Sequence, residues 1–495
     1  MSHRHMDRLT SFDTSFLANE RANGHMAIGA VLVCEGEPPD PDDFLTHILS
    51  RVHQLPRLRQ RLLYPPLGLG TPFWVDHAEF DIHHHVRRVT LSAPGDEAQF
   101  RALVGELLAP PLDRAKPLWE LILVEGFAED RFAIVYKTHH AMADGISAVD
   151  IGMLLFDLEP RAEPDREVAP WRPHRTPSRL SLVGRAGSGI LATLARLGRW
   201  LRRALREPGR ARRRAADGIS GLWEVTWNLT RPAPGTPWNT EIGRTRSFSW
   251  STFDLGELKA VKNALGGTVN DVTLAVAAGA LRRWLRERDV AVDGLELKAL
   301  VPVSIRTVDE HGELGNKLTA MRGPLPVGIA DPIERLRTIT AAMDALKSSK
   351  QPLGAEAIWG LNDWFRDFAP PVLLGPTAAI NFSTRLFNLL VTNFPGPQMP
   401  FYVLGRELVA IHPVGFLARR HALAIAILSY NGAVSFGLLA NPEVLPDAED
   451  LNAHLAASVE ELKAAAQIAS PVDGDDVAGD DRPRFARDRE RLADA

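Results

Sequence analysis

The chain has 495 residues, 45% hydrophobic and 24% charged, and its 57 Lys and Arg against 61 Asp and Glu leave a formal net charge of −4. This balance excludes collagen, a disulfide-rich scaffold and a wholly disordered chain, and it gives no long-range attraction to nucleic acid. Cys34 is the single cysteine, which excludes internal disulfides and cysteine-rich metal sites. Because no run of about 18 apolar residues occurs and the first residues lack an apolar core, we expect neither a membrane-spanning helix nor a signal peptide.

The pattern over residues 1–160 predicts a mixed α/β unit. Apolar, β-rich runs bounded by Gly and Pro indicate strands, and apolar residues at four-residue spacing indicate helices. Asp40 or Asp42 is suited to cap the first of these helices. The elements are a strand over 27–36, a helix over 44–55, a strand over 132–140 and a helix over 146–158.

Residues 161–240 differ in composition and are predicted to form a linker that carries its own helix. The four prolines in 161–177 rule out a regular element there. Between Arg179 and Arg214, eleven arginines stand against one acidic residue, Glu207. Apolar residues recur in this stretch at spacings of three and four, which predicts a basic amphipathic helix ending before Pro208.

Residues 241–468 are predicted to form a second α/β unit, followed by a charged tail over 469–495 that has too few apolar residues to fold. The tail should therefore be disordered. The predicted elements of the second unit are helices over 268–288 and 331–350 and strands over 297–305, 389–397, 421–430 and 433–440.

The sharpest chemical feature is the segment HHAMADG, which places His139 and His140 at the end of a predicted strand and Asp144 and Gly145 in the turn after it. Neighbouring side chains on a strand point to opposite sides, so only one imidazole can face a given cleft. An imidazole titrates near neutrality and can take a proton from an alcohol and return it to a leaving group. The alternatives are a metal pair or two core histidines, but two neighbours on a strand cannot easily bind one ion.

This pattern resembles the HHxxxDG active-site motif of the bacterial wax ester synthase/diacylglycerol acyltransferase family, part of the superfamily of CoA-dependent acyltransferases. Further segments resemble those of the family in the same order over residues 8–465, and the ordered set is more specific than any one motif. They are SFDTSFL (11–17), Pro117-Leu118-Trp119, VNDVTLAVAAGALR (269–282), PVSIR (302–306), Gly315-Asn316, TNFPGP (392–397), LSYNG (428–432) and FGLLA (436–440).

The resemblance implies an α/β fold of two chloramphenicol-acetyltransferase-like subdomains with mixed sheets, joined by the long helical linker, with a tunnel between them. It implies acyl transfer from long-chain acyl-CoA, a co-substrate, to the hydroxyl of diacylglycerol or a fatty alcohol, with no bound cofactor. In the family the second histidine of the motif is the general base, here His140, beside His139. Asp144 would orient the loop. Asn270 of the ND pair would donate to the oxyanion, or else cap its helix.

Supporting roles are also implied. Gly145 permits the sharp turn after the histidines, Asp271 supports the architecture, and Arg306 is a candidate partner for Asp144 across the two halves. The segment Pro117-Leu118-Trp119 is expected to pack beside the acyl or acceptor channel. His83-His84-His85 is expected to bind no metal.

The role of the basic segment and the acceptor of the reaction each allow more than one interpretation. The basic segment Arg179–Arg214 could bind an anionic membrane or a lipid droplet, or it could pack on the protein body; RNA binding fits less well because interleaved aromatic residues are lacking. With membrane binding, the enzyme would be cytoplasmic and attached peripherally to the inner membrane face or to lipid droplets. Alternative functions are acylation of a specialised glycolipid or polyketide hydroxyl, and lipid binding by a catalytically inactive relative.

Overall fold

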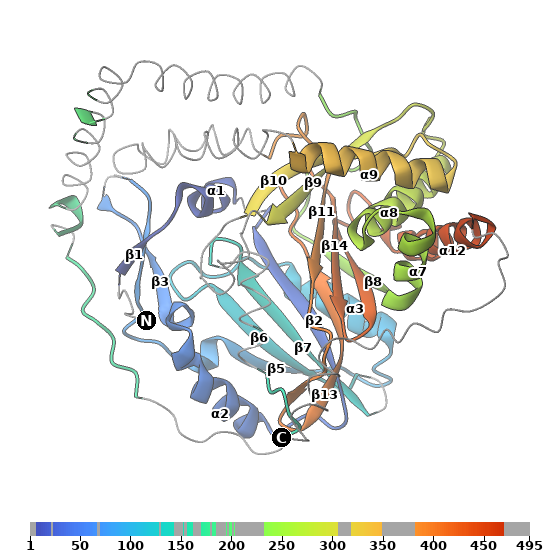
Figure 1. The fold of residues 1–495 in the computed structure, drawn as a ribbon. Helices are drawn as coiled ribbons and strands as arrows, with labels where there is room; N and C mark the ends of the chain where they lie inside the picture. Colours follow the sequence, from blue (N-terminus) through green and yellow to red (C-terminus); the bar gives the residue numbers. More distant parts are fainter. Residues whose placement is uncertain are drawn as a thin grey trace, which may run out of the picture.

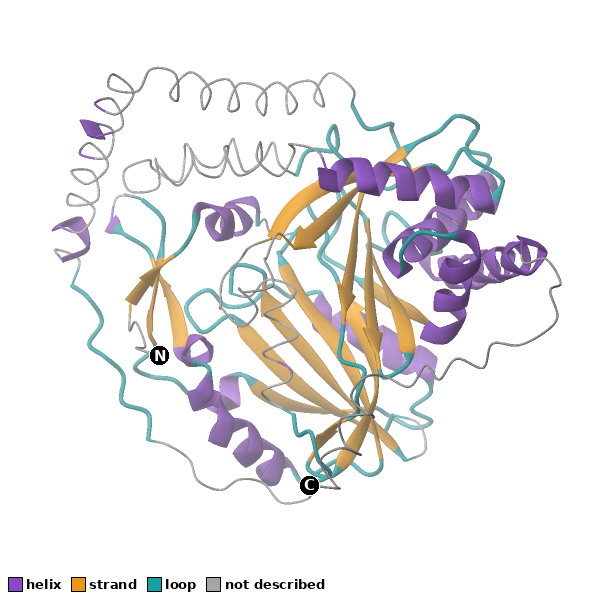
Figure 2. Ribbon diagram, in the orientation of Figure 1, coloured by secondary structure: helices purple, strands orange, loops and turns teal. Residues whose placement is uncertain are grey.

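The computed structural model describes residues 6–20, 23–66, 70–127, 130–142, 156–161, 170–178, 181–184, 232–304, 318–348 and 382–469, and a few single positions between 152 and 202. These residues build two six-stranded mixed sheets and a small three-stranded sheet (Figures 1 and 2). The two large sheets lie next to each other in the centre of the molecule, and most helices lie at its periphery (Figure 2).

The first large sheet has the strand order β12–β13–β2–β7–β6–β5 and is antiparallel except for the pair β5 and β6. Its central strand β7 is buried along almost its whole length, as expected for an uninterrupted apolar run covered on both faces. The bounds are β2 Ala27–Glu35, β5 Val86–Thr90, β6 Trp119–Glu125, β7 Arg131–His139, β12 Phe401–Val403 and β13 Arg406–Val414, with helices α1 Ser11–Asn19, α2 Pro41–Arg51 and α3 Glu97–Leu108 nearby.

The predicted strands over 27–36 and 132–140 are confirmed as β2 and β7, and the predicted helix over 44–55 is α2, which begins three residues earlier. Asp40 caps α2, because its side chain accepts hydrogen bonds from the backbone N–H groups of Asp42 and Asp43. The predicted helix over 146–158 lies largely outside the described residues.

The second large sheet has the order β10–β9–β11–β14–β15–β8, with β11 parallel to both of its neighbours. β14 and β15 form a hairpin closed by Asn431 and Gly432, whose φ angles of 44° and 85° suit an Asn-Gly turn. The strands predicted over 297–305, 389–397, 421–430 and 433–440 are confirmed. The bounds are β8 Ser247–Asp254, β9 Leu297–Ser304, β10 Leu318–Leu325, β11 Leu389–Pro395, β14 Leu423–Tyr430 and β15 Ala433–Ala440.

Four helices cover the outer face of the second sheet (Figure 1): α7 Leu255–Leu265, α8 Val269–Arg286, α9 Pro332–Ser348 and α12 Leu451–Ala469. α8 and α9 confirm the helices predicted over 268–288 and 331–350. Within the described part of the chain no single helix is long and apolar enough to cross a membrane; α7 and α8 pass that test only as a pair, bent by 98°.

A crossover of the chain joins the two large sheets. The sequence assigns all of 241–468 to the second unit, but β12 and β13 leave it and extend the first sheet, where β13 pairs with β2. β13 also passes close to the second sheet: a Cβ atom added to Gly437 of β15 would lie 1.9 Å from the carbonyl oxygen of Pro413. The two halves are therefore interlocked rather than joined only by a linker.

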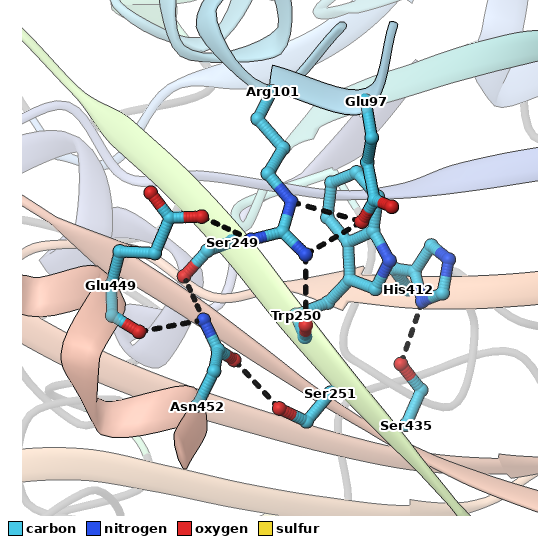
Figure 3. Close-up of polar contacts among 9 residues, drawn as sticks. All are labelled: Glu97, Arg101, Ser249, Trp250, Ser251, His412, Ser435, Glu449 and Asn452. Atoms are coloured by element: carbon cyan, nitrogen blue, oxygen red, sulfur yellow. Dashed lines mark hydrogen bonds and ion pairs between the residues drawn. The ribbon is translucent and has the colours of Figure 1, made fainter. Parts of the chain in front are cut away.

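A stack of side chains fixes this junction (Figure 3). The guanidinium of Arg101, on α3, lies 4.7 Å from the ring centroid of Trp250 on β8 and donates to Glu449 beyond β15. The other face of Trp250 lies at 4.5 Å from the ring of His412 on β13, and Nδ1 of His412 is 2.8 Å from Oγ of Ser435 on β15. Side chains from α3 and β13 of the first half and from β8 and β15 of the second half are thus in direct contact.

The small sheet, with the order β1–β4–β3, lies beside the first half and receives the start of the linker. Its strands are β1 Met6–Arg8, β3 Gln60–Leu63 and β4 Phe73–Asp76. The side chain of Leu182, at the start of the predicted basic helix, is 2% exposed and packs against Phe73 and Val75 of β4. Most of the range Arg179–Arg214 lies outside the described residues, as does the tail from 470.

Candidate active site

Strand β7 delivers both histidines to the point where the two halves meet. The backbone N–H of His139 donates to Leu118 O at 3.0 Å, and that of His140 donates to Met26 O at 2.9 Å. Leu118 and Met26 directly precede β6 and β2, the two neighbours of β7. The pair is therefore held by hydrogen bonds on both sides, which fixes the direction of each side chain.

The imidazole of His140 is enclosed by aromatic rings from both halves. Phe16 of α1 stacks on it, with ring centroids 3.9 Å apart and planes 11° apart, and Phe416 meets it edge-on at 5.6 Å. Phe382, which precedes β11, lies within 6 Å of both phenylalanines. Burial lowers the pKa of His140 from 6.5 to about 3, and neighbouring His139 contributes in the same direction. At neutral pH His140 is therefore uncharged and able to accept a proton.

His139 lies in a different environment, as the strand alternation predicts. Its Nδ1 accepts a hydrogen bond from the backbone N–H of Ala141 at 3.0 Å, and its Nε2 is 3.5 Å from Oε2 of Glu20. Since Nδ1 is an acceptor, the ring hydrogen sits on Nε2 and faces the carboxylate. Arg114 donates to the same carboxylate oxygen at 2.7 Å. Burial raises the pKa of Glu20, but His139 and Arg114 outweigh it and hold that pKa at about 2.

One helix therefore contacts both imidazoles. Phe16 lies in α1 and Glu20 caps its C-terminus, so the two side chains are four residues apart and project to the same side of the helix. Arg114 also donates to the carbonyl oxygen of Leu17 in α1. The sequence analysis missed Phe16, Glu20 and Arg114 as site residues, although the spacing of Phe16 and Glu20 in SFDTSFLANE could have pointed to them.

Other histidines of the described part are also kept neutral by burial. The pKa values of His25 and His412 are both lowered to about 3, first by burial and then by nearby cations. The triplet His83-His84-His85 does not converge on one point: the ring of His85 is buried and stacked on Trp119 at 4.7 Å, whereas His83 and His84 are exposed.

The ND pair begins α8, where Thr268 is the N-cap. Asp271 completes a capping box, because its Oδ2 accepts hydrogen bonds from the backbone N–H and the hydroxyl of Thr268. These contacts fix the first turn of α8, and the supporting role expected of Asp271 in the active site stays a prediction. Asn270 is not the cap; its Oδ1 accepts a hydrogen bond at 3.1 Å from Nδ2 of Asn393 on β11. Asn393 was not singled out in the sequence, although it lies in the TNFPGP segment.

The segment Pro117-Leu118-Trp119 lies in the core of the first half. Trp119 is fully buried, and its Nε1 donates to Leu58 O at 2.8 Å. The carbonyl oxygen of Leu118 receives the N–H of His139 and, at 3.2 Å, the hydroxyl of Thr138. These contacts show how the segment supports β7, while its place beside an acyl channel stays a prediction.

Three predicted site residues, Asp144, Gly145 and Arg306, lie outside the described residues, so their roles also stay predictions. In the described part of the chain, no three His, Cys, Asp or Glu side chains are grouped closely enough to hold a metal ion.

Solved structures place this fold in a known class. The wax ester synthase/diacylglycerol acyltransferase from Marinobacter aquaeolei VT8 superposes with a TM-score of 0.63 at 25% identity, covering 93% of this chain and 100% of that one. The starter condensation domain of rhizomide synthetase, solved with C8-CoA and Leu-SNAC, shares the fold at a TM-score of 0.56 and 17% identity, over 96% of this chain and 98% of that one. Two mixed sheets with a histidine at their junction define a chloramphenicol-acetyltransferase-like acyltransferase fold.

Sequence comparisons identify the family. Residues 9–273 match the wax ester synthase/diacylglycerol acyltransferase catalytic domain, and residues 314–463 match the C-terminal domain of the same family. The probable diacylglycerol O-acyltransferase tgs1 of Mycobacterium tuberculosis H37Rv is 32% identical over 455 residues, covering 90% of this chain and 93% of that protein. A putative diacylglycerol O-acyltransferase of the same organism is 32% identical over 454 residues, covering 89% and 87%. The chain belongs to the wax ester synthase/diacylglycerol acyltransferase family and is an acyltransferase.

Proposed function

We propose that the protein transfers a long-chain acyl group from acyl-CoA to the hydroxyl of diacylglycerol or a fatty alcohol, with His140 as the general base. The observation that carries this proposal is the neutral imidazole packed against Phe16 and Phe416, with Phe382 behind these two rings. Aromatic walls around the base favour lipid substrates, because apolar chains gain free energy by leaving water there. The names of the relatives, diacylglycerol O-acyltransferase and wax ester synthase, support these two acceptors.

The proposed reaction depends on which ring nitrogen of His140 faces the substrate. Nδ1 of His140 is buried next to the residue's own backbone, which contributes a hydrogen bond to the imidazole, so Nε2 is the nitrogen assigned to the substrate. Nε2 takes the hydroxyl proton while the hydroxyl oxygen attacks the thioester carbon, and the carbonyl electron pair moves onto oxygen. When the carbonyl reforms, the C–S bond breaks and the sulfur takes the proton from the imidazolium. The products are an ester, the free thiol of CoA and neutral His140.

Burial makes the imidazole of His140 a weak base, so the substrate hydroxyl must be held close to Nε2 for proton transfer. An imidazolium surrounded by phenylalanine rings is poorly solvated, and this favours passing the proton on to the leaving sulfur. None of these proposed reaction steps requires a covalent acyl-enzyme, a bound cofactor or a metal ion. Buried Cys34, whose pKa is raised by burial, is unsuited as a nucleophile.

The test is an assay of purified enzyme with palmitoyl-CoA, offering diacylglycerol and hexadecanol separately. We expect CoA release that requires an acceptor, that persists in EDTA and that is lost in His140→Ala and His140→Gln. His85→Gln, which changes another buried histidine, is the matched control and should retain activity. Acceptor-independent release, or full activity in both His140 variants, would contradict the proposed base. No release with either acceptor would favour a specialised hydroxyl as substrate.

We also propose that the arginine-rich part of Arg179–Arg214 attaches the enzyme to the anionic cytoplasmic membrane surface or to lipid droplets, since each basic residue near such a surface contributes about 1 kcal/mol. The packing of Leu182 on the small sheet supports an anchored start for this segment. In liposome co-sedimentation, neutralising Arg196, Arg199, Arg202, Arg203 and Arg206 together should reduce binding to anionic vesicles. Equal sedimentation of both proteins would contradict the membrane role.

A further inference from the structure

We infer that Asn393 and Thr273 orient the side-chain amide of Asn270 so that its Nδ2 donates to the thioester carbonyl oxygen. This inference rests on the proposed function, because it specifies the group that would stabilise the oxyanion formed there. It makes Asn393 and Thr273 positioning residues, which act on the reaction only through Asn270. Three hydrogen bonds connect these residues in a chain, and each fixes the direction of the next.

The chain starts at the hydroxyl of Thr273, a fully buried residue in α8. Its Oγ1 is 2.8 Å from the backbone carbonyl oxygen of Asn270, one turn earlier. A carbonyl oxygen can only accept, so the single hydroxyl hydrogen is used in this bond. Towards any other neighbour, Oγ1 of Thr273 can therefore act only as an acceptor.

That neighbour is the side chain of Asn393. Its amide lies 3.0 Å from Oγ1 of Thr273, and the group facing an acceptor must be the NH₂ group, so Nδ2 is on this side. The second hydrogen of Nδ2 points to the side chain of Asn270 at 3.1 Å. Because Asn393 offers a hydrogen there, Asn270 must present its Oδ1. The orientation of both amides thus follows from one hydroxyl group.

The remaining group of Asn270 is then its Nδ2, which has no hydrogen-bond partner among the described residues. Two N–H donors are therefore left for a ligand, beside Oδ1 of Asn393 as an acceptor. Asn270 also lies in the first turn of α8, a helix of 18 residues, where the helix dipole favours negative charge. These features suit an oxygen that gains negative charge during the reaction.

Strand β11, which carries Asn393, also passes close to the segment that carries Phe416. Gly415 directly precedes Phe416, whose ring contacts His140, and a Cβ atom added to Gly415 would lie 3.6 Å from Cδ2 of Leu390. Leu390 and Asn393 are three residues apart on β11, which corresponds to about 10 Å along a strand. Asn393 therefore lies on the same strand as Leu390, which packs beside the segment that carries Phe416.

Single variants test the chain of bonds. Asn270→Ala should lower kcat by about 10²–10³-fold, the usual loss for one oxyanion donor, with the KM for acyl-CoA unchanged. Asn393→Asp removes both N–H groups without changing size, so Asn270 would turn its Nδ2 inward, and kcat should fall to within about tenfold of Asn270→Ala. Thr273→Val should lower kcat and Thr273→Ser should restore it. Asn452→Asp is the matched control: Nδ2 of Asn452 also donates to a hydroxyl, Ser249 Oγ at 2.9 Å, but at the distant junction in Figure 3.

A double variant separates positioning from an independent role. If Asn393 acts only through Asn270, the kcat of Asn270→Ala/Asn393→Asp should equal that of Asn270→Ala alone. In addition, Asn270→Asp should be less active than Asn270→Ala, because Asn393 would hold one carboxylate oxygen and the other would face the oxyanion. A general loss of structure would not produce this order, and thermal unfolding of each variant measures such a loss.

Three results would overturn the inference: additive losses in the double variant, wild-type kcat in Asn393→Asp, or equal activity of Asn270→Asp and Asn270→Ala. If Asn393→Asp does not fold, Thr273→Val and the comparison of the two Asn270 variants still decide. Wild-type activity in Asn270→Ala would refute the oxyanion role and this inference together. The proposed function would stand in that case if His140→Ala were inactive.

Discussion

Removing the ring of Phe16 should expose the imidazole of His140, the proposed base, and change its pKa. In Phe16→Ala, water reaches one face of the His140 imidazole, which the wild-type ring covers at a centroid distance of 3.9 Å. Exposure stabilises the imidazolium, so the pKa of His140 should rise towards its ordinary value. The acid limb of the pH profile of kcat/KM should therefore shift to higher pH in the variant.

The expected size follows from the enclosure. The interval from 6.5 to about 3 corresponds to roughly 5 kcal/mol at 1.36 kcal/mol per pKa unit. Three phenylalanines form the enclosure, and Phe16 makes the closest contact, so its removal should raise the pKa by about one to two units. At pH 5, activity relative to pH 7.5 should then fall by up to about half in Phe16→Ala and remain unchanged in the wild type.

The assay is CoA release from palmitoyl-CoA between pH 4.5 and 8, followed with a thiol reagent that reacts in acid. Truncating a buried phenylalanine costs about 3–5 kcal/mol of stability, so unfolding must be measured at each pH. Phe100→Ala is the matched control, because Phe100 is equally buried and stacks on Phe127 at 4.1 Å, away from His140. The reasoning fails if both variants have the wild-type acid limb, or if Phe100→Ala shifts it equally.

The remaining predictions concern acid stability, the pair formed by Glu20 and His139, and the crossover. The three histidines whose pKa burial lowers to about 3 stay neutral in the folded protein, whereas in the unfolded chain they bind protons below about pH 6.5. Stability should thus be independent of these groups above pH 6.5 and decline from there to pH 3, by about 1.4 kcal/mol per histidine at pH 5.5; equal urea midpoints at pH 7.5 and 5.5 would contradict this. Glu20→Gln keeps the shape but removes the charge facing His139 and Arg114, so it should lower kcat and also the melting temperature, because Arg114 loses its ionic partner; unaltered kcat would exclude a positioning role. Gly437→Ala places a Cβ against the backbone of Pro413 and should destabilise the protein by about 1–3 kcal/mol in urea unfolding, whereas Gly235→Ala, which meets nothing within 4 Å, should not.

The sequence alone was sufficient for features that depend on near neighbours. Strand β7 could be predicted from one apolar run, α8 from its apolar spacing, and the β14–β15 hairpin from Asn431 and Gly432. Each of these depends on backbone preferences and hydrogen bonds within a few residues. The HHxxxDG segment and its ordered companions also indicated the family, which the comparisons confirm.

The tertiary structure decided what depends on residues far apart in the chain. Burial lowers the pKa of His140, and the rings that pack on it come from positions 16 and 416, which no local period brings together. Likewise, β13 reads as one more strand of the second half, but it pairs with β2 almost 400 residues earlier. Strand pairing and desolvation are sums over contacts between distant segments, whereas periodicity and turn residues report only local preference. The sequence therefore determined the elements and indicated the family, and the packing of the two halves determined the environment of His140, the proposed base.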